Sequence, residues 1–255
     1  MSTKDPQLTF FEHLEELRRR LLISLTAVTL AGTGGYLASD RILALLTEPL
    51  RRYADGLYFF SPQGAFLVKL KVALLVGIIG ASPVVLHQLW AFLAPGLHGH
   101  EKRAALPLAA VTSFLFVTGA VFAQFVVMPA AMRFLVGLES DSLRPMISVE
   151  EYVSFLSCML VAFGVAFNLP VVVLSLVLAG FTDATGLNRF QKQAVVLIFV
   201  GAAVLTPGPD VASQLLLALP LLALFELSVL AAVIVGAARR RRGAAAAVSV
   251  PERRA

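Results

Sequence analysis

The chain has 255 residues, of which 58% are hydrophobic and 15% are charged, and its mean hydropathy is +0.83. Soluble globular chains carry about 25% charged residues, and the apolar residues here form long uncharged blocks, which excludes a soluble domain and indicates a membrane protein. The net charge is +5, but no basic run alternates with aromatic residues, which argues against nucleic acid as a partner.

Residues 9–20 predict an amphipathic helix. Thr9 and Glu12 have the spacing of a capping box, in which two side chains satisfy the first backbone amides of a helix. Apolar residues then recur at helical spacing, and the charged residues fall on the other faces. We expect this helix to lie on the membrane surface before the first span. Its apolar face is formed by Phe10, Leu14, Leu17 and Leu21.

The apolar blocks that follow predict six membrane spans, since a spanning helix needs about 20 apolar residues. Pro129 is expected to end the third span, and two prolines and a glycine within residues 206–210 separate the last two. The fifth block covers only about 18 Å, against a hydrocarbon core of about 30 Å. We therefore expect the last two spans to be short: either flanking polar residues are drawn into the membrane, or the two segments form a shallow hairpin, or the bilayer thins around them. The predicted spans are about 21–39, 72–94, 104–128, 152–180, 194–206 and 211–237.

These spans predict an all-α, polytopic membrane protein with one membrane domain, residues 1–238, and a basic, disordered tail, residues 239–255. Six spans place both termini on one side, and that side carries 14 of the 21 Lys and Arg residues. Because positive charge accumulates on the cytoplasmic side, both termini are predicted to be cytoplasmic. Lys69 and Lys71 are exceptions on the other side, and we expect them to reach toward the membrane surface.

One loop and one span hold further candidate residues. Glu101 lies beside Lys102 and Arg103, so it either pairs with these cations or docks a basic peptide by accepting a guanidinium through two hydrogen bonds. The small residues 32–35 favour close helix packing. No phosphate-binding loop and no hydrolase motif occurs, and two loop histidines make a poor metal site. We predict no enzymatic activity, no cofactor and no metal.

Five segments, spread over about residues 8–235, match motifs of one known family. They are FFEHLEELRRRL at 10–21, SP at 61–62 with AFLVKLKVAL at 65–74, SPVVLHQLWAFLAPGLHGHEKR at 82–103, FGVAFNLPVV at 163–172 and LTPGPDVASQLLLALPLLALFEL at 205–227. In this order they resemble the TatC family, the core subunit of the twin-arginine protein translocase. The resemblance implies six helices in a cupped arrangement that read signal peptides bearing a paired-arginine motif.

The resemblance also implies roles for individual residues. The signal-peptide site would contain Glu101, Phe92, Glu16, Arg18 and Leu17. Positions with functional or partner contacts would be Pro49, Pro83, Asp210 and Gln214. The implied partners are single-span proteins of the TatA and TatB type, further copies of this chain and the lipid of a bacterial inner membrane, with the proton gradient as energy source.

Asn168 and Glu226 are two polar residues within the predicted spans. Many TatC members carry a glutamate where this chain has Asn168, which cannot titrate, so we expect it to make a polar contact between helices. Glu226 is the one remaining carboxylate in a span, and a functional and a structural role are equally open.

Two other function classes require features that the sequence offers only in part or lacks. A secondary transporter of a small solute or ion needs charged or broken helices near the bilayer midplane, and only Asn168–Pro170 and Glu226 qualify. An intramembrane enzyme needs a nucleophile or metal constellation, which the sequence lacks.

Overall fold

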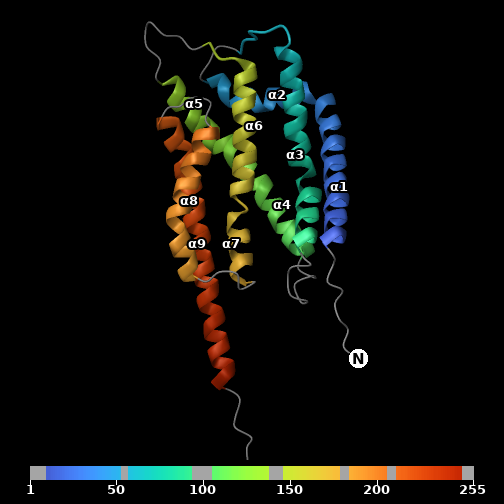
Figure 1. Cartoon of the computed structure of the whole chain (residues 1–255). Coiled ribbons are helices and arrows are strands. Elements are labelled where there is room, and N and C mark those ends of the chain that lie inside the picture. The colour runs from blue at the N-terminus through green and yellow to red at the C-terminus, as the bar shows by residue number, and fades with distance from the viewer. Residues whose placement is uncertain are drawn as a thin grey trace, which may run out of the picture.

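The computed structural model describes residues 10–52, 57–93, 105–137, 146–178, 184–205 and 211–248. Within these ranges the secondary structure is helical, apart from a single bridge between Tyr58 and Ser148. The helices run alternately in opposite directions (Figure 1), so that α1, α3, α4–α5, α6–α7, α8 and α9 make six passes. The prediction of an all-helical, polytopic membrane protein is confirmed.

The first helix, α1 (Phe10–Leu37), contains both the amphipathic stretch and the first apolar block without a break. After Ala38 the chain turns into α2 (Ser39–Thr47), and the axis bends by 81°. A 3-10 turn, η1 (Glu48–Arg52), follows. As a result α2 lies across one end of the other helices (Figure 1). We refer to this end as the α2 end, and to the end where α1 begins as the amino-terminal end.

The third helix, α3 (Gly64–Leu93), starts eight residues before the predicted block. It can do so because the lysines of its first turns have partners: Lys69 pairs with Asp40 at 2.9 Å, and Lys71 lies 3.5 Å from Glu150. Side by side with α1, it crosses that helix at very close range. A methyl group on Gly77 would lie only 2.7 Å from the Val28 carbonyl oxygen.

The third pass consists of α4 (Ala105–Phe122), a π-helical turn η4 (Ala123–Val127) and α5 (Met128–Val136). The prediction that Pro129 ends this helix is wrong, since the chain stays helical for seven more residues. A π-helical turn relaxes the backbone hydrogen bonding just before the proline. Pro129 then occupies the first turn of α5, where the missing N–H and the fixed φ angle are compatible with a helix.

The fourth pass is divided into α6 (Val149–Ala166) and α7 (Leu169–Leu178). Ser148 caps α6, because its hydroxyl accepts a hydrogen bond from the Glu151 amide. The break at residues 167–168 lies within the block that the sequence predicts as one continuous span, and it falls just before Pro170. Pro170 has no backbone N–H to donate to the carbonyl of residue 166, and its ring crowds that carbonyl, which explains the position of the break.

The last two passes are α8 (Ala184–Leu205) and α9 (Val211–Val248). Helix α9 continues through Arg239–Arg242 to Val248, so the prediction of a disordered tail from residue 239 is wrong for its first ten residues. Alanine and arginine both have high helix propensity, and nothing in this alanine-rich stretch stops the helix. In Figure 1 this end of α9 extends well beyond the other helices.

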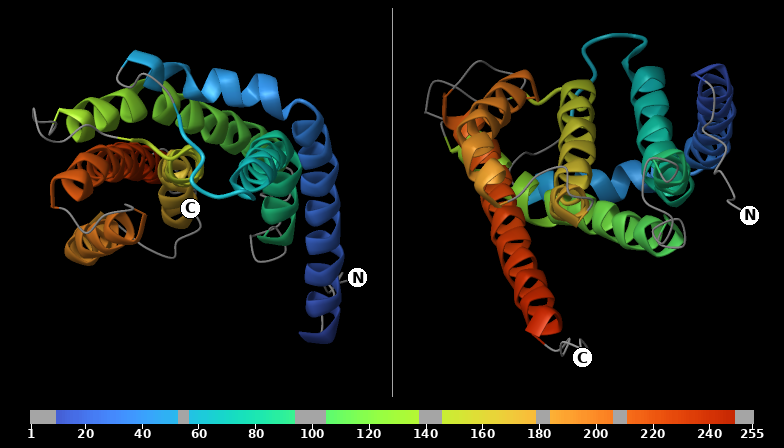
Figure 2. Two further views of the ribbon diagram at one scale, coloured as in Figure 1. Left: turned by 90° about the horizontal axis from the view of Figure 1, so that it is seen from above. Right: turned by 60° about the horizontal axis from the view of Figure 1, so that its bottom comes forward.

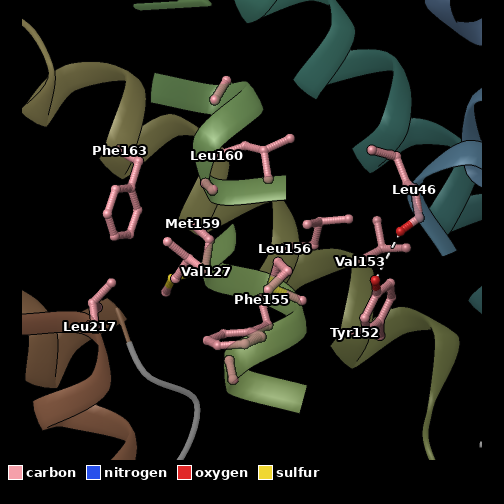
Figure 3. Packing of buried hydrophobic residues seen from close by; sticks show 14 of the residues in the cluster. Leu46, Val127, Tyr152, Val153, Phe155, Leu156, Met159, Leu160, Phe163 and Leu217 are labelled. Carbon is pink, nitrogen blue, oxygen red and sulfur yellow. Dashed lines mark hydrogen bonds between the residues drawn. The ribbon is translucent and has the colours of Figure 1, made fainter. Parts of the chain in front are cut away.

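The helices form an arc that stays open on one side, as the left view of Figure 2 shows. Helix α1 packs mainly on α3, and α8 packs mainly on α9, so these two helices form the opposite edges of the arc. The main core lies between, where α2, η4, α5, α6 and α9 meet. There the Tyr152 hydroxyl donates a hydrogen bond of 2.9 Å to the Leu46 carbonyl (Figure 3), which ties α2 to α6.

Four described stretches are long and apolar enough to cross a membrane: Gly64–Phe92, Leu106–Val136, Val149–Ser175 and Leu217–Ile234. The bent pair α1–α2 is a fifth candidate. In α8 the apolar part is only Gln191–Val204, about 21 Å long. The apolar stretch of α8, which forms one edge of the arc, is therefore shorter than those of the four candidate spans.

Candidate functional site

Most described residues of the predicted signal site lie at the amino-terminal end of the molecule, where α1 begins and α3 ends. The ring of Phe92, near the end of α3, stacks on the ring of His13 in α1, with 4.4 Å between the centroids and 16° between the planes. One turn further along α1 lie Glu16 and Leu17, and Leu17 is 43% exposed. The packing of α1 on α3 thus brings together residues about 75 positions apart in the sequence.

Glu16 is bound by an arginine of its own helix. Arg20 donates from Nε, at 2.9 Å, and from Nη2, at 2.5 Å, to the same carboxylate oxygen of Glu16. The side chains of both residues are 23% exposed, so water screens this pair only in part. The other carboxylate oxygen of Glu16 lies 4.0 Å from Nδ1 of His13.

Arg20 also links α1 to α3, because its Nη1 donates a hydrogen bond of 3.1 Å to the side-chain oxygen of Gln88. This bond connects two helices through side chains 68 positions apart in the sequence. The sequence did not indicate a role for Arg20 in the site. Its spacing of four residues from Glu16 is the signal that could have identified it.

Not all predicted residues join this cluster. Arg18 is exposed on α1 and belongs to no described ion pair. Glu101 and Asp210 fall outside the described residues. Pro49 lies half-buried in η1, and Pro83 lies exposed within α3, where the helix continues past it. Pro49 thus lies at the α2 end, away from the Glu16 cluster, whereas Pro83 precedes Gln88 by five residues of α3.

Asn168 lies at the break between α6 and α7 and is 8% exposed. Its Nδ2 donates to the Gly164 carbonyl at 2.9 Å, and its backbone carbonyl accepts from the first amides of α7. The expected contact between helices is therefore wrong for the amide nitrogen, whose bond is local. A short amide side chain at the end of a helix readily bonds a carbonyl one turn back. The side-chain oxygen is buried and has no partner among the described residues.

Gln214 and Glu226 both hold α9 against α8. The Gln214 side chain donates to the Phe199 carbonyl at 2.9 Å. Further along α9, Glu226 accepts a hydrogen bond from Gln191 of α8, and Glu226 is otherwise exposed. These two bonds connect the edge helix α8 to the rest of the arc.

In the part of the chain that the structure describes, no three His, Cys, Asp or Glu side chains lie close enough to hold a metal ion. The chemistry available at the amino-terminal end is instead that of a carboxylate, an amide and a stacked pair of rings. A carboxylate in this setting suits a guanidinium, which can form two parallel hydrogen bonds with it. The ring pair offers a face on which a guanidinium can stack.

Comparison with known proteins gives a consistent result over most of the chain. Residues 12–220 match the sequence family described as "Sec-independent protein translocase protein (TatC)". The protein of that name from Carboxydothermus hydrogenoformans is 42% identical over 226 residues, which are 89% of this chain and 93% of the relative. The one from Aquifex aeolicus is 41% identical over 222 residues, 86% of this chain and 92% of the relative.

Solved structures agree with these relatives. The crystal structure described as "Twin Arginine Translocase Receptor- TatC in DDM" is 40% identical in sequence to the chain, with a TM-score of 0.78. The similarity covers 86% of this chain and 98% of that one. A second crystal structure of the same receptor gives a TM-score of 0.79 at 39% identity.

Proposed function

Because the chain belongs to the TatC family of Sec-independent protein translocase proteins, we propose that it is the signal-reading core subunit of a twin-arginine translocase. Members of this family are membrane-embedded translocase components and not enzymes. The chain binds twin-arginine signal peptides of folded precursors at its amino-terminal end. It then nucleates the complex that the proton gradient drives.

The observation that carries this proposal is the arginine that Glu16 already binds. Arg20 places two of its nitrogens on one Glu16 oxygen and a third nitrogen on Gln88, so this cluster has the geometry to hold a guanidinium. An arginine of a signal peptide would compete with Arg20 for Glu16. A lysine has one compact ammonium group and cannot reproduce the forked contact, which gives a basis for discrimination between the two.

The other parts of the site follow from their positions. The stacked rings of His13 and Phe92 adjoin Glu16 and offer a flat surface to a second guanidinium. Glu101 follows shortly after α3 in the sequence and would supply a second carboxylate, while Leu17 and Arg18 complete the α1 side. The apolar stretch of the signal peptide would then lie along the open side of the arc (Figure 2).

The remaining assignments concern location and partners. Both termini lie in the cytoplasm of a bacterial cell, and the α2 end faces the exterior, in keeping with the excess of Lys and Arg on the side of the termini. The partners are single-span proteins of the TatA and TatB type and further copies of this chain. Exposed polar positions on α9, such as Glu226, are available to such partners within the membrane.

The test compares neighbouring carboxylates in binding of a synthetic signal peptide. Glu16→Gln is expected to weaken binding of an Arg-Arg peptide about tenfold, because one charge-assisted pair of hydrogen bonds is lost. Glu15→Gln removes the same charge from an exposed position one residue away and should leave binding nearly unchanged. Equal losses in both variants would mean that the site attracts cations in general and does not read arginine.

A second experiment includes Glu101. A photoreactive residue at position 92 or 101 is expected to crosslink to the Arg-Arg peptide and not to a Lys-Lys version. Glu101→Ala should abolish export of a folded precursor while the protein still inserts into the membrane. Normal export by that variant would contradict the proposal.

A further inference from the structure

A pocket of about 560 Å³ lies between α3 and α6 at the α2 end, remote from the Glu16 cluster. Lys71 of α3 and Glu150 and Ser154 of α6 line its polar part. The Lys71 amine donates to the Ser154 hydroxyl at 2.7 Å and lies 3.5 Å from the Glu150 carboxylate. A charged pair from two different helices thus forms one wall of the pocket.

The direction of Lys71 distinguishes it from its neighbour in the same helix. Lys69 turns to α2, where it pairs with Asp40. Lys71 lies seven residues into α3, about 10 Å along its axis, and contacts α6 in place of lipid or water. Its side chain is 35% exposed, so the amine remains accessible from the pocket.

The pocket changes from polar to apolar along α6. Its polar side chains, including Ser148, Glu151 and Ser154, belong to the first turns of that helix, whereas Phe155 and Cys158 lie deeper. Over the ten residues from Ser148 to Cys158 this gradient spans about 15 Å. Exposed aromatic residues at 58–60 flank the opening, as expected at the level of lipid headgroups. A ligand with a polar head and an apolar body fits this gradient.

The charges in the pocket narrow the choice of head group. One lysine faces two glutamates, so the pocket carries an excess of one negative charge. The Ser61 hydroxyl, which also lines the pocket, is buried and has no hydrogen-bond partner among the described residues. Buried polar groups normally have partners, so this hydroxyl is available to a ligand.

We propose that this pocket binds the headgroup of a zwitterionic phospholipid with a primary ammonium, such as a phosphatidylethanolamine. The phosphate contacts Lys71 and the Ser61 hydroxyl, and the ammonium contacts the Glu150 and Glu151 carboxylates. An anionic headgroup adds to the negative excess and is disfavoured, and a choline headgroup has no N–H to donate. An acyl chain extends along Phe155 toward the interior of the bilayer.

The test measures lipid binding to the purified full-length protein in detergent by native mass spectrometry. Palmitoyl-oleoyl phosphatidylethanolamine is expected to bind about tenfold more tightly than the phosphatidylglycerol or phosphatidylcholine with the same chains. Lys71→Met should weaken binding of the phosphatidylethanolamine strongly, because the phosphate loses its cation, and Lys69→Met should leave that affinity unchanged, although both variants lose one lysine from α3. Glycerophosphoethanolamine, which lacks the chains, should bind more weakly than the lipid.

A second pair of variants changes exposed residues, so that an altered lipid preference does not result from misfolding. Glu151→Gln is an exposed change that removes the negative excess, so the preference for ethanolamine over glycerol headgroups should fall. Glu48→Gln, at another exposed acidic position of the α2 end, should leave it unchanged. Equal binding of the three lipids, or equal effects of the Lys69 and Lys71 variants, would overturn the proposal. If Lys71→Met binds lipid as before but loses its crosslinks to the signal peptide, the proposal is also overturned, because the pocket is then a peptide site.

Discussion

Arg20 holds the Glu16 carboxylate through Nε and Nη2, and Gln88 holds Arg20 from the neighbouring helix. Any cation that binds Glu16 must therefore share or replace this arginine. Replacement of Arg20 by another guanidinium forms the same hydrogen bonds to Glu16, so the free-energy change of this exchange is small. Replacement by an ammonium loses the forked geometry.

We expect Arg20→Gln to bind an Arg-Arg signal peptide several-fold more tightly than the unchanged protein, because the competitor for Glu16 is gone. Arg19→Gln is the matched control, since it removes the same charge from an exposed position of α1. Titration of a labelled peptide measures both. Weaker binding in Arg20→Gln than in Arg19→Gln would show that Arg20 positions the carboxylate and does not compete for it.

The sequence predicts part of this residue-scale arrangement. Glu16 and Arg20 are four residues apart in a helix, a spacing that brings their side chains together. The link to Gln88 and the stacking of His13 on Phe92 depend on how α1 and α3 cross. That crossing is set by packing over many residues, and no local pattern encodes it.

At the scale of elements, α1 and α3 cross at close range, and at Gly77 the approach is between backbone and backbone. Gly77 lies against the Val28 carbonyl and the Gly32 backbone, and a methyl group there has no free space. Backbone atoms cannot move aside as a flexible side chain can. The two helices can therefore keep their distance only while this position has no side chain.

Gly77→Ala is expected to destabilise the protein by roughly 1–3 kcal/mol, because the helices must separate or distort. Gly34→Ala is the control, since Gly34 faces open space on the same pair of helices, and alanine favours a helix over glycine. Thermal unfolding in detergent compares the two. Equal melting temperatures would show that the helix contact adjusts without strain.

The helices themselves were predictable to different degrees. Long apolar blocks identify the passes, because hydrocarbon requires them. The breaks follow backbone details that a hydropathy pattern does not contain. Pro129 does not end its helix because a π-helical turn precedes it, and Asn168 separates α6 from α7 just before Pro170.

For the whole molecule, the helices of the arc differ in the length of their apolar stretches. The apolar stretch Gly64–Phe92 of α3 covers about 43 Å, and that of α8 covers about 21 Å. A bilayer that fits one of these helices does not fit the other. The sequence predicted the short block but left open how it meets the membrane.

We expect α8 to respond to bilayer thickness more strongly than α3. In a bilayer about 5 Å thicker, the mismatch at α8 should amount to roughly 1–2 kcal/mol. Hydrogen exchange in nanodiscs of two acyl-chain lengths should therefore show faster exchange of α8 amides in the thicker bilayer. Helix α3 serves as the internal control. Equal changes in both helices would exclude mismatch at α8.

The π-helical turn at Ala123–Val127 determines how the fold responds to a change in chain length during evolution. Such a turn holds one residue more than an α-helical turn, and each residue advances an α-helix by about 100°. Loss of one residue here would convert it to an ordinary α-helical turn, so α5 would nearly keep its present orientation. Met128, Ala131 and Met132 would then stay in the core. The chain can therefore shorten by one residue at these five positions, whereas loss of a residue within α4 would rotate the rest of the pass by about 100°.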